Sequence, residues 1–242
     1  MGRKTLLQVE GATKIYRQGQ VEVPALRGVD LHLERGAFAA LVGSSGSGKT
    51  TLLNLIGALD RPTSGRIVLE GKDLGALSAS ARARLRRDRI GFVFQAYNLI
   101  PVLTAFENAE MVLALQKVPR DERRRRVLGL LREVGLTGLE HRRPDQLSGG
   151  QQQRVAIARA VAPNPALVLA DEPTANVDSH TAERLLDLMQ RMNEQDGVTF
   201  LFSTHDPRVI RRARRVIRLR DGRVEADEVQ GGAQAGEEPA AP

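Results

Sequence analysis

Cysteine is absent from this chain of 242 residues, and aromatic residues make up only 3% of it. Without cysteine the chain forms no disulfide bond and no thiolate metal site, which is typical of proteins in a reducing compartment. No stretch approaches the ~20 consecutive apolar residues of a membrane-spanning helix. Residues 1–10 also lack the apolar core of a secretion signal. We therefore expect a cytoplasmic location.

The formal net charge is +7, and arginine supplies most of the positive charge. Arginines cluster at residues 82–89, 123–126 and 211–215. A basic surface favours nucleic acid or the anionic face of a membrane. Acidic residues are interleaved with these arginines, however, and aromatic side chains for base stacking are scarce. We interpret the clusters as solvated helix faces and expect no nucleic acid as a partner, while contact with lipid headgroups stays an alternative.

A phosphate-binding loop is the clearest motif, because residues 43–50 read GSSGSGKT and match G-x-x-x-x-G-K-[ST] without a gap. An apolar run at 38–42 predicts a buried strand before the loop, and residues 51–56 predict a helix after it. We expect Lys49 to reach the β- and γ-phosphates and the Thr50 hydroxyl to bind Mg²⁺. The predicted nucleotide-binding residues of the loop are Gly43, Ser44, Ser45, Gly46, Ser47, Gly48, Lys49, Thr50 and Thr51.

Two carboxylates follow a second apolar run, where residues 167–170 are succeeded by Asp171 and Glu172. Adjacent side chains on a strand point to opposite faces unless the strand end relaxes, so we expect the two acids to have different roles. Asp171 is suited to hold Mg²⁺ through its water shell. Glu172 is suited to orient, or to take a proton from, the water that attacks the γ-phosphate.

The remaining patterns predict an α/β protein. The apolar runs at 167–170 and 198–202 predict parallel strands, joined by a helix from Thr181 to Asn193. Residues from about 78 to 138 have helical character. The tail from Glu225 to Pro242 is rich in Gly, Ala, Glu and Pro, and we expect it to be disordered. Antiparallel strands are predicted near the N-terminus at residues 6–10 and 31–34, and a further strand is predicted at 66–71.

A third motif starts at Leu147, where the chain reads LSGGQ and continues QQRVAIARA. Ser148 with Gln151 three residues later forms a capping box, so a helix begins here with free N–H groups that suit a second anion site. Local physics alone also permits an ordinary capped helix. Together with the phosphate-binding loop and the acidic strand end, the string closely resembles the signature of the ABC (ATP-binding cassette) ATPases.

The resemblance implies roles for further residues. Gln95, in the segment FVFQAYNL, is similar to the Q-loop glutamine, which touches Mg²⁺ and senses the γ-phosphate. His205 resembles the switch histidine, which contacts the γ-phosphate. Asn176 and Asp178 lie in a segment similar to the D-loop, which crosses the dimer interface. Tyr16 resembles the aromatic residue that stacks on adenine, although a half-buried edge tyrosine is the alternative. The implied catalytic residues are Glu172, His205 and Gln95, and the implied metal ligands are Thr50, Gln95 and Asp171.

The same resemblance implies an ABC ATPase fold over residues 5–224. This is a P-loop NTPase with a mostly parallel core sheet, an N-terminal antiparallel β subdomain and an inserted helical subdomain at about 76–160. It also implies a homodimer in which Ser148, Gly149, Gly150 and Gln151 of one subunit close over ATP held by the other. ATP and Mg²⁺ are the implied cofactors. A separate membrane permease is the implied partner, which would place the chain peripherally on the inner face of the cell membrane.

Within this family, segments 43–65, 98–108 and 169–176 are similar to the lipoprotein-releasing and macrolide-export ATPases. We therefore expect a transporter subunit for export or for lipoprotein or drug extrusion, with the permease docking beside residues 97–101. A nucleotide-gated clamp without a transport role is an alternative. A P-loop kinase is a second alternative, which the signature argues against.

Overall fold

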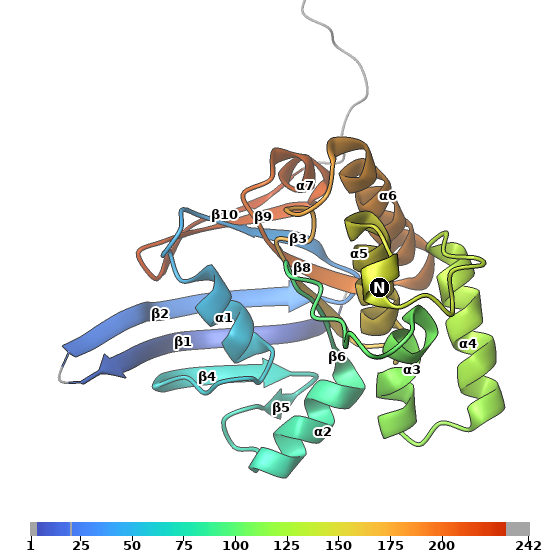
Figure 1. Cartoon of the computed structure of the whole chain (residues 1–242). Coiled ribbons are helices and arrows are strands. Elements are labelled where there is room, and N and C mark those ends of the chain that lie inside the picture. Colours follow the sequence, from blue (N-terminus) through green and yellow to red (C-terminus); the bar gives the residue numbers. More distant parts are fainter. Residues whose placement is uncertain (1–3, 20, 231–242) are drawn as a thin grey trace, which may run out of the picture.

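The computed structural model describes residues 4–19 and 21–230, and these form two β-sheets with helices packed around them (Figure 1). The first sheet is antiparallel, four-stranded and ordered β2-β1-β4-β5. It contains the two segments for which the sequence predicts antiparallel strands, and this prediction is confirmed. The further strand predicted at 66–71 is also in this sheet, although it ends at Leu69. Its strands are β1 (Thr5–Gln18), β2 (Val21–Glu34), β4 (Ser64–Leu69) and β5 (Lys72–Asp73).

The second sheet is six-stranded, with the order β10-β9-β3-β8-β7-β6. All neighbouring strands from β9 to β6 run parallel, and only β10 at the edge is antiparallel to its neighbour. The predicted mostly parallel core sheet is therefore confirmed. The strands are β3 (Phe38–Val42), β6 (Ile90–Val93), β7 (Leu167–Asp171), β8 (Thr199–Ser203), β9 (Arg215–Arg220) and β10 (Arg223–Val229).

The central strands of this core sheet, β3, β7 and β8, are mostly apolar, because both of their faces are covered. Every residue of β3 and β8 is buried. Phe200 and Phe202 face a core shared with the helices, and Phe38 packs against Phe202 at 4.7 Å between ring centroids. Leu201, between the two phenylalanines, faces the opposite core, which it shares with the antiparallel sheet. This sandwich holds the carboxyl ends of the parallel strands rigidly at one edge.

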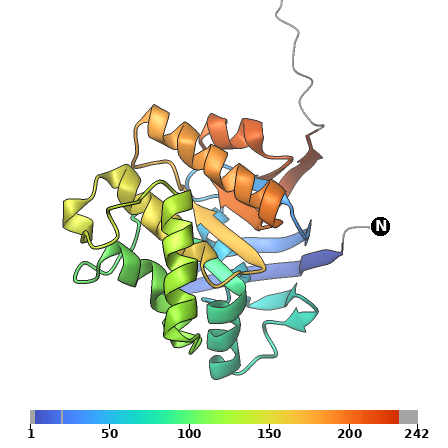
Figure 2. The same ribbon diagram turned by 90° about the vertical axis from the view of Figure 1, so that its right-hand side faces the viewer.

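Helices α3 and α4 lie side by side next to α5, at the far side of the core sheet from β1 and β2 (Figures 1 and 2). Capping boxes begin two of the helices, with Thr104 before α3 and Ser148 before α5. The helices are α1 (Lys49–Ile56), α2 (Ala79–Arg89), α3 (Ala105–Leu115), α4 (Arg120–Glu133), α5 (Gly149–Val161), α6 (Ser179–Asp196) and α7 (Pro207–Arg212), with a 3₁₀ turn at Pro144–Gln146.

The predicted helical run at 78–138 is wrong in one respect, because β6 interrupts it. Residues 90–93 pair in parallel with β7, so this short segment belongs to the core sheet. The helical subdomain therefore does not run unbroken from about 76 to 160. Four apolar residues directly after a helix carry too little periodicity to separate a strand from a helix end.

The predicted start of a disordered tail at Glu225 is also too early. Strand β10 continues to Val229 and pairs with β9 along its length. Residues 231–242, which complete the predicted tail, lie outside the described residues. Among the described residues, no helix combines the length and the apolar character needed to cross a bilayer.

Candidate nucleotide-binding site

A cavity of about 600 Å³ lies where β3, β7 and β8 end. Ligand sites of open α/β sheets form at this edge, outside the carboxyl ends of the strands. Segments far apart in the sequence meet here, and they include most of the predicted site. The predicted residues that line the cavity are Gly43, Ser44, Ser45, Gly46, Gly48, Lys49, Thr50, Thr51, Gln95, Asp171, Glu172 and His205.

The phosphate-binding loop runs from the end of β3 into α1, as its spacing predicts. Gly48, the residue before α1, has a left-handed backbone with φ 103°, which glycine adopts without strain. No side chain caps this helix, so the N–H groups of its first turn are free to bind an anion. The Lys49 ammonium nitrogen Nζ donates to the carbonyl of Gly43 at 2.7 Å and to that of Ser44 at 3.0 Å. The loop thus concentrates positive charge at one wall of the cavity.

Ser47 is the loop residue that the cavity lining omits. It is buried, and its hydroxyl oxygen has no hydrogen-bond partner among the described residues. Its backbone N–H donates to the carbonyl of Ser44 at 3.2 Å, which closes the turn of the loop. Ser47 therefore stabilises the turn of the loop from a buried position. Its predicted contact with nucleotide stays a prediction.

The two carboxylates after β7 both face the cavity. Asp171 ends the strand, and Glu172 has a left-handed backbone with φ 45° that breaks the alternation of side chains. The strand end therefore relaxes the alternation, which is the exception allowed above, and the different roles of the two acids stay a prediction. The Glu172 N–H donates to the Ser203 carbonyl at 2.8 Å, which fixes the turned backbone against the end of β8. Such a strained position is common at functional sites.

The Glu172 carboxylate is oriented by two neighbours. Its Oε2 accepts from the Thr204 hydroxyl at 3.0 Å, and its Oε1 lies 2.6 Å from Nδ1 of His205. The Glu172 side chain is only 14% exposed, whereas the His205 side chain is 79% exposed and free to reach a ligand. Sequence reasoning missed Thr204. Its place between the end of β8 and His205 was the only available signal.

Asp206, the next residue, also joins the site to a neighbouring segment. Its Oδ2 accepts from the Thr174 hydroxyl at 2.7 Å and from Nη2 of Arg208 at 2.7 Å. Burial acts to raise the pKa of Asp206, but the hydrogen bonds from Arg208 and Thr174 outweigh it and hold the pKa at about 2. A carboxylate that is ionised at neutral pH thus anchors the His205 segment to the chain that follows Glu172.

The signature residues do not line this cavity. Ser148 and Gln151 form the predicted capping box: the Ser148 N–H donates to Gln151 Oε1 at 2.9 Å, and the Gln151 N–H donates to Ser148 Oγ at 3.3 Å. Gly149 abuts the Q-loop, since a Cβ on it would lie 2.8 Å from the Tyr97 hydroxyl. One chain therefore does not bring its own signature onto its own phosphate-binding loop.

Three further predicted residues also lie outside the lining of the cavity. Asp178 caps α6 by accepting from the Thr181 N–H at 2.9 Å, and this interaction lowers its pKa. Asn176 donates from Nδ2 to the Gln95 carbonyl at 2.8 Å, so it contacts the Q-loop. Tyr16 is half-buried on β1, and its ring lies 5.0 Å from Lys14 Nζ. Its predicted stacking on adenine stays a prediction.

Comparison with known proteins agrees with this geometry. The pattern of the family "ABC transporter" matches residues 26–175. The chain is 51% identical over 222 residues to the lipoprotein-releasing system ATP-binding protein LolD of Anaeromyxobacter dehalogenans, covering 91% of this chain and 93% of that protein. It is 50% identical over 224 residues to the macrolide export ATP-binding/permease protein MacB of Syntrophobacter fumaroxidans, covering 92% of this chain but only 31% of that protein.

A solved structure gives the same result for the fold. The dimeric ATP-binding cassette MJ0796, in a post-hydrolysis state bound to ADP and Pi, superimposes with a TM-score of 0.88 at 44% identity, covering 94% of this chain and all of that one. A protein of the same name in Methanocaldococcus jannaschii is 45% identical over 227 residues, covering 92% of this chain and 97% of that protein. The resemblance seen in the motifs is confirmed, and the chain belongs to the ABC transporter family as an ATP-binding and ATP-hydrolysing cassette.

Proposed function

We propose that this chain hydrolyses ATP to energise a separate membrane permease, for export or for the extrusion of lipoproteins or drugs. The observation that carries the proposal is the pairing of a phosphate-binding loop with Glu172, Thr204 and His205 across one cavity. The high identity to LolD and to the cassette part of MacB supports this direction of transport. A chain that energises a permease would lie peripherally on the inner face of the cell membrane.

Hydrolysis at this site is phosphoryl transfer to water, which depends on positioning and charge neutralisation. Lys49 and the N-terminus of α1 hold the phosphates of ATP. Glu172, whose carboxylate is fixed by Thr204, orients the attacking water and takes up its proton. His205 reaches the γ-phosphate from its exposed position, and Gln95 contacts the same phosphate from the opposite loop.

The residues present fit a Mg²⁺ ion that arrives with ATP. No group of three or more His, Cys, Asp or Glu side chains at metal-binding spacing occurs among the residues described. The cavity instead offers the Thr50 hydroxyl, the Gln95 amide and the Asp171 carboxylate. Mg²⁺ suits such a sparse oxygen set, because it keeps several waters and takes the rest of its ligands from phosphates. When bound, the ion neutralises charge that develops on the γ-phosphate.

We infer that two copies of the chain form a head-to-tail dimer around two ATP molecules. The inference is supported by the position of the start of α5. This helix start can present N–H groups to an anion, yet it does not line the nucleotide cavity of its own chain. Across the dimer, Ser148, Gly149, Gly150 and Gln151 contact the ATP held by the partner subunit. The similar MJ0796 cassette is a dimer. Nucleotide then stabilises the assembly by mass action.

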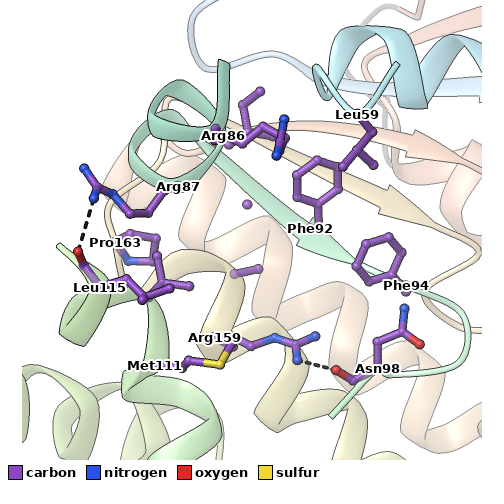
Figure 3. Close-up of a pocket in the computed structure, with 15 residues that line it drawn as sticks. Leu59, Arg86, Arg87, Phe92, Phe94, Asn98, Met111, Leu115, Arg159 and Pro163 are labelled. Atoms are coloured by element: carbon purple, nitrogen blue, oxygen red, sulfur yellow. Dashed lines mark hydrogen bonds between the residues drawn. The ribbon is translucent and has the colours of Figure 1, made fainter. Parts of the chain in front are cut away.

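We further propose that the permease docks in a groove of about 380 Å³ beside the Q-loop (Figure 3). The floor is apolar, with Phe92, Phe94 and Leu115 among its lining residues. Arg86 and Arg159 also line it, and none of the residues that line it is acidic. This combination suits a short amphipathic segment of the permease that carries a carboxylate beside its apolar face.

Replacing Glu172 with glutamine tests the catalytic assignment. The variant keeps the hydrogen bond from Thr204 but cannot take up a proton, so we expect kcat to fall about 10²- to 10⁴-fold while ATP still binds. Turnover is measured by phosphate release, and dimer formation by light scattering with ATP and Mg²⁺. The matched control is Glu228→Gln, which removes an exposed carboxylate on β10. A Glu172→Gln protein that turns over at the wild-type rate would remove Glu172 from the mechanism.

The same variant serves as bait for the partner. With ATP and Mg²⁺ it is incubated with detergent-solubilised native membranes, and the captured proteins are identified by mass spectrometry. A stoichiometric membrane protein whose capture is lost on Arg86→Glu substitution supports docking in the groove. Failure to capture any membrane protein under conditions that trap the dimer contradicts the permease part of the proposal.

A further inference from the structure

The Q-loop contains two consecutive residues with strained backbones. Tyr97 has φ 59° and Asn98 has φ 48°, a left-handed conformation that residues other than glycine rarely adopt. Two such residues in a row need support from the surrounding structure. The support is identifiable here, and it comes from both sides of the loop.

On the inner side, Arg159 of α5 holds the strained carbonyls. Its Nη2 donates to the Tyr97 carbonyl at 2.8 Å, and its Nη1 donates to the Asn98 carbonyl (Figure 3). Arg159 is 8% exposed, and burial lowers its pKa. It has no ion pair with any carboxylate among the residues that the structure describes. Because this buried cation has its hydrogen bonds with two carbonyls of the loop, a movement of the loop is expected to move α5 with it.

On the outer side, the Tyr97 side chain reaches the D-loop. Its hydroxyl donates to the Asn176 carbonyl at 2.9 Å, and Asn176 Nδ2 returns a bond to the Gln95 carbonyl at 2.8 Å. Burial raises the pKa of Tyr97, so the phenol stays protonated and keeps its donor hydrogen. The two bonds run in opposite directions between the same two segments, which makes their geometry mutually dependent.

The same hydroxyl touches the start of the signature helix. A Cβ on Gly149 would lie 2.8 Å from it and 3.3 Å from the Asn176 carbonyl oxygen. The Q-loop, the D-loop and the first turn of α5 thus meet around one oxygen atom. The proposed function assigns contacts with ATP to residues of the Q-loop and of the signature helix, and the family resemblance implies that the D-loop crosses the dimer interface.

We propose that Tyr97 is a positioning residue for ATP hydrolysis, whose hydroxyl fixes the D-loop and the start of the signature helix relative to Gln95. Asn98 and Arg159 line the groove on the other side of the same loop, so a partner seated there shifts all three segments together. The inference rests on the proposed roles of Gln95 and the signature. Tyr97 does not line the nucleotide cavity, so in this proposal it acts on hydrolysis through its neighbours.

Tyr97→Phe is the sharpest test, because it retains the ring and removes only the hydroxyl. Loss of this hydrogen bond, which acts on the assembled site, is expected to lower kcat about two- to tenfold. The KM for ATP should change less than twofold, because the phosphate-binding loop is untouched. A general loss of structure would instead lower the thermal midpoint. Gln190→Ala is the control, since it removes an exposed hydrogen bond to Glu194 on α6 and should leave kcat unchanged.

A double-mutant cycle with Asn176→Ala tests whether the two bonds act as one unit. If they do, the kcat of the double variant lies within about twofold of the lower of the two single-variant kcat values. An unchanged kcat in Tyr97→Phe, or a kcat loss matched by the loss of folded protein, overturns the proposal. Strictly additive losses also overturn it, because the bonds would then be independent.

Glu172→Gln is assayed in parallel, so that the two levels of inference stay separate. If Glu172→Gln abolishes turnover while Tyr97→Phe leaves kcat at the wild-type value, the ATPase assignment stands and the role of Tyr97 is wrong. If Glu172→Gln turns over normally, the catalytic assignment is wrong, and the kcat of Tyr97→Phe still reports on the hydroxyl.

Discussion

Two helix starts in this chain differ in how their N–H groups are used. Helix α1 begins at a glycine with no side-chain cap, and its first turn faces the cavity of its own chain. Helix α5 begins at Ser148, whose capping box with Gln151 satisfies part of its N-terminus, and it lies outside that cavity. The difference suggests a division of labour. Under the proposed function, the uncapped start would bind phosphate within one chain, while the capped start, stable alone, would act on ATP held by the partner subunit.

The largest expected effect tests phosphate binding at the start of α1. Lys49→Ala removes the ammonium that lies beside the free N–H groups of α1. We expect ATP affinity to fall about 100-fold, because charge-assisted hydrogen bonds to phosphate are lost together with the local positive charge. Titration with a fluorescent ATP analogue measures the Kd. A Kd within threefold of wild type would show that the backbone of the loop suffices for binding.

The next largest effect tests whether the start of α5 contacts ATP held by the partner subunit. Ser148→Asp keeps a strong N-cap for α5 but places a negative charge where the partner's ATP would lie. We expect kcat to fall more than tenfold, with the thermal midpoint and the ATP Kd of the monomer unchanged. Like-charge repulsion across the interface is the physical reason. The measurements are phosphate release, thermal unfolding and titration below the dimerisation concentration.

Ser148→Ala is the matched control for that substitution. It removes the cap without adding charge, so it should lower the free energy of unfolding by about 1 kcal/mol. If Ser148→Asp and Ser148→Ala lowered kcat equally while only the alanine variant lost stability, repulsion would play no part. If neither changed kcat, α5 would be an ordinary capped helix, as its local sequence alone permits.

Local sequence patterns predicted most of what these two helix starts show. The loop spacing at 43–50 and the capping box at Ser148 and Gln151 are short-range signals, because each motif satisfies its own backbone groups. The continuous apolar runs likewise predicted β3, β7 and β8. In each of these elements, the residues that determine the local structure lie within about a dozen positions of one another.

The features that the sequence did not predict depend on contacts between distant segments. Strand β6 is a strand because it pairs with β7, and β10 extends past Glu225 because it pairs with β9. The left-handed backbone of Glu172 is fixed by the Ser203 carbonyl, which is 31 positions further along the chain. Tertiary contacts override local propensity in each case. Helix starts, which carry local signals, are therefore more predictable than strand ends.

The smallest expected effect concerns a third helix start, that of α7, where a carboxylate is the cap. Asp206 accepts from the Arg208 N–H at 2.9 Å and also pairs with the Arg208 guanidinium. Asp206→Asn keeps a good N-cap but removes the charge. Since the folded pKa is about 2 against an ordinary 3.8, the charged form stabilises the fold. After discounting for solvent screening, we expect a loss of about 1 kcal/mol at pH 7.

The pH dependence of that loss identifies its origin. Because the folded pKa is lowered, the contribution of Asp206 is fully present above an unfolded pKa near 3.8 and disappears as pH falls through about 2. Unfolding in urea at pH 7 and near pH 2 should therefore show a difference between wild type and Asp206→Asn only at the higher pH. A difference that persists at the lower pH would assign the effect to geometry, and α7 would then resemble α5, whose cap needs no charge.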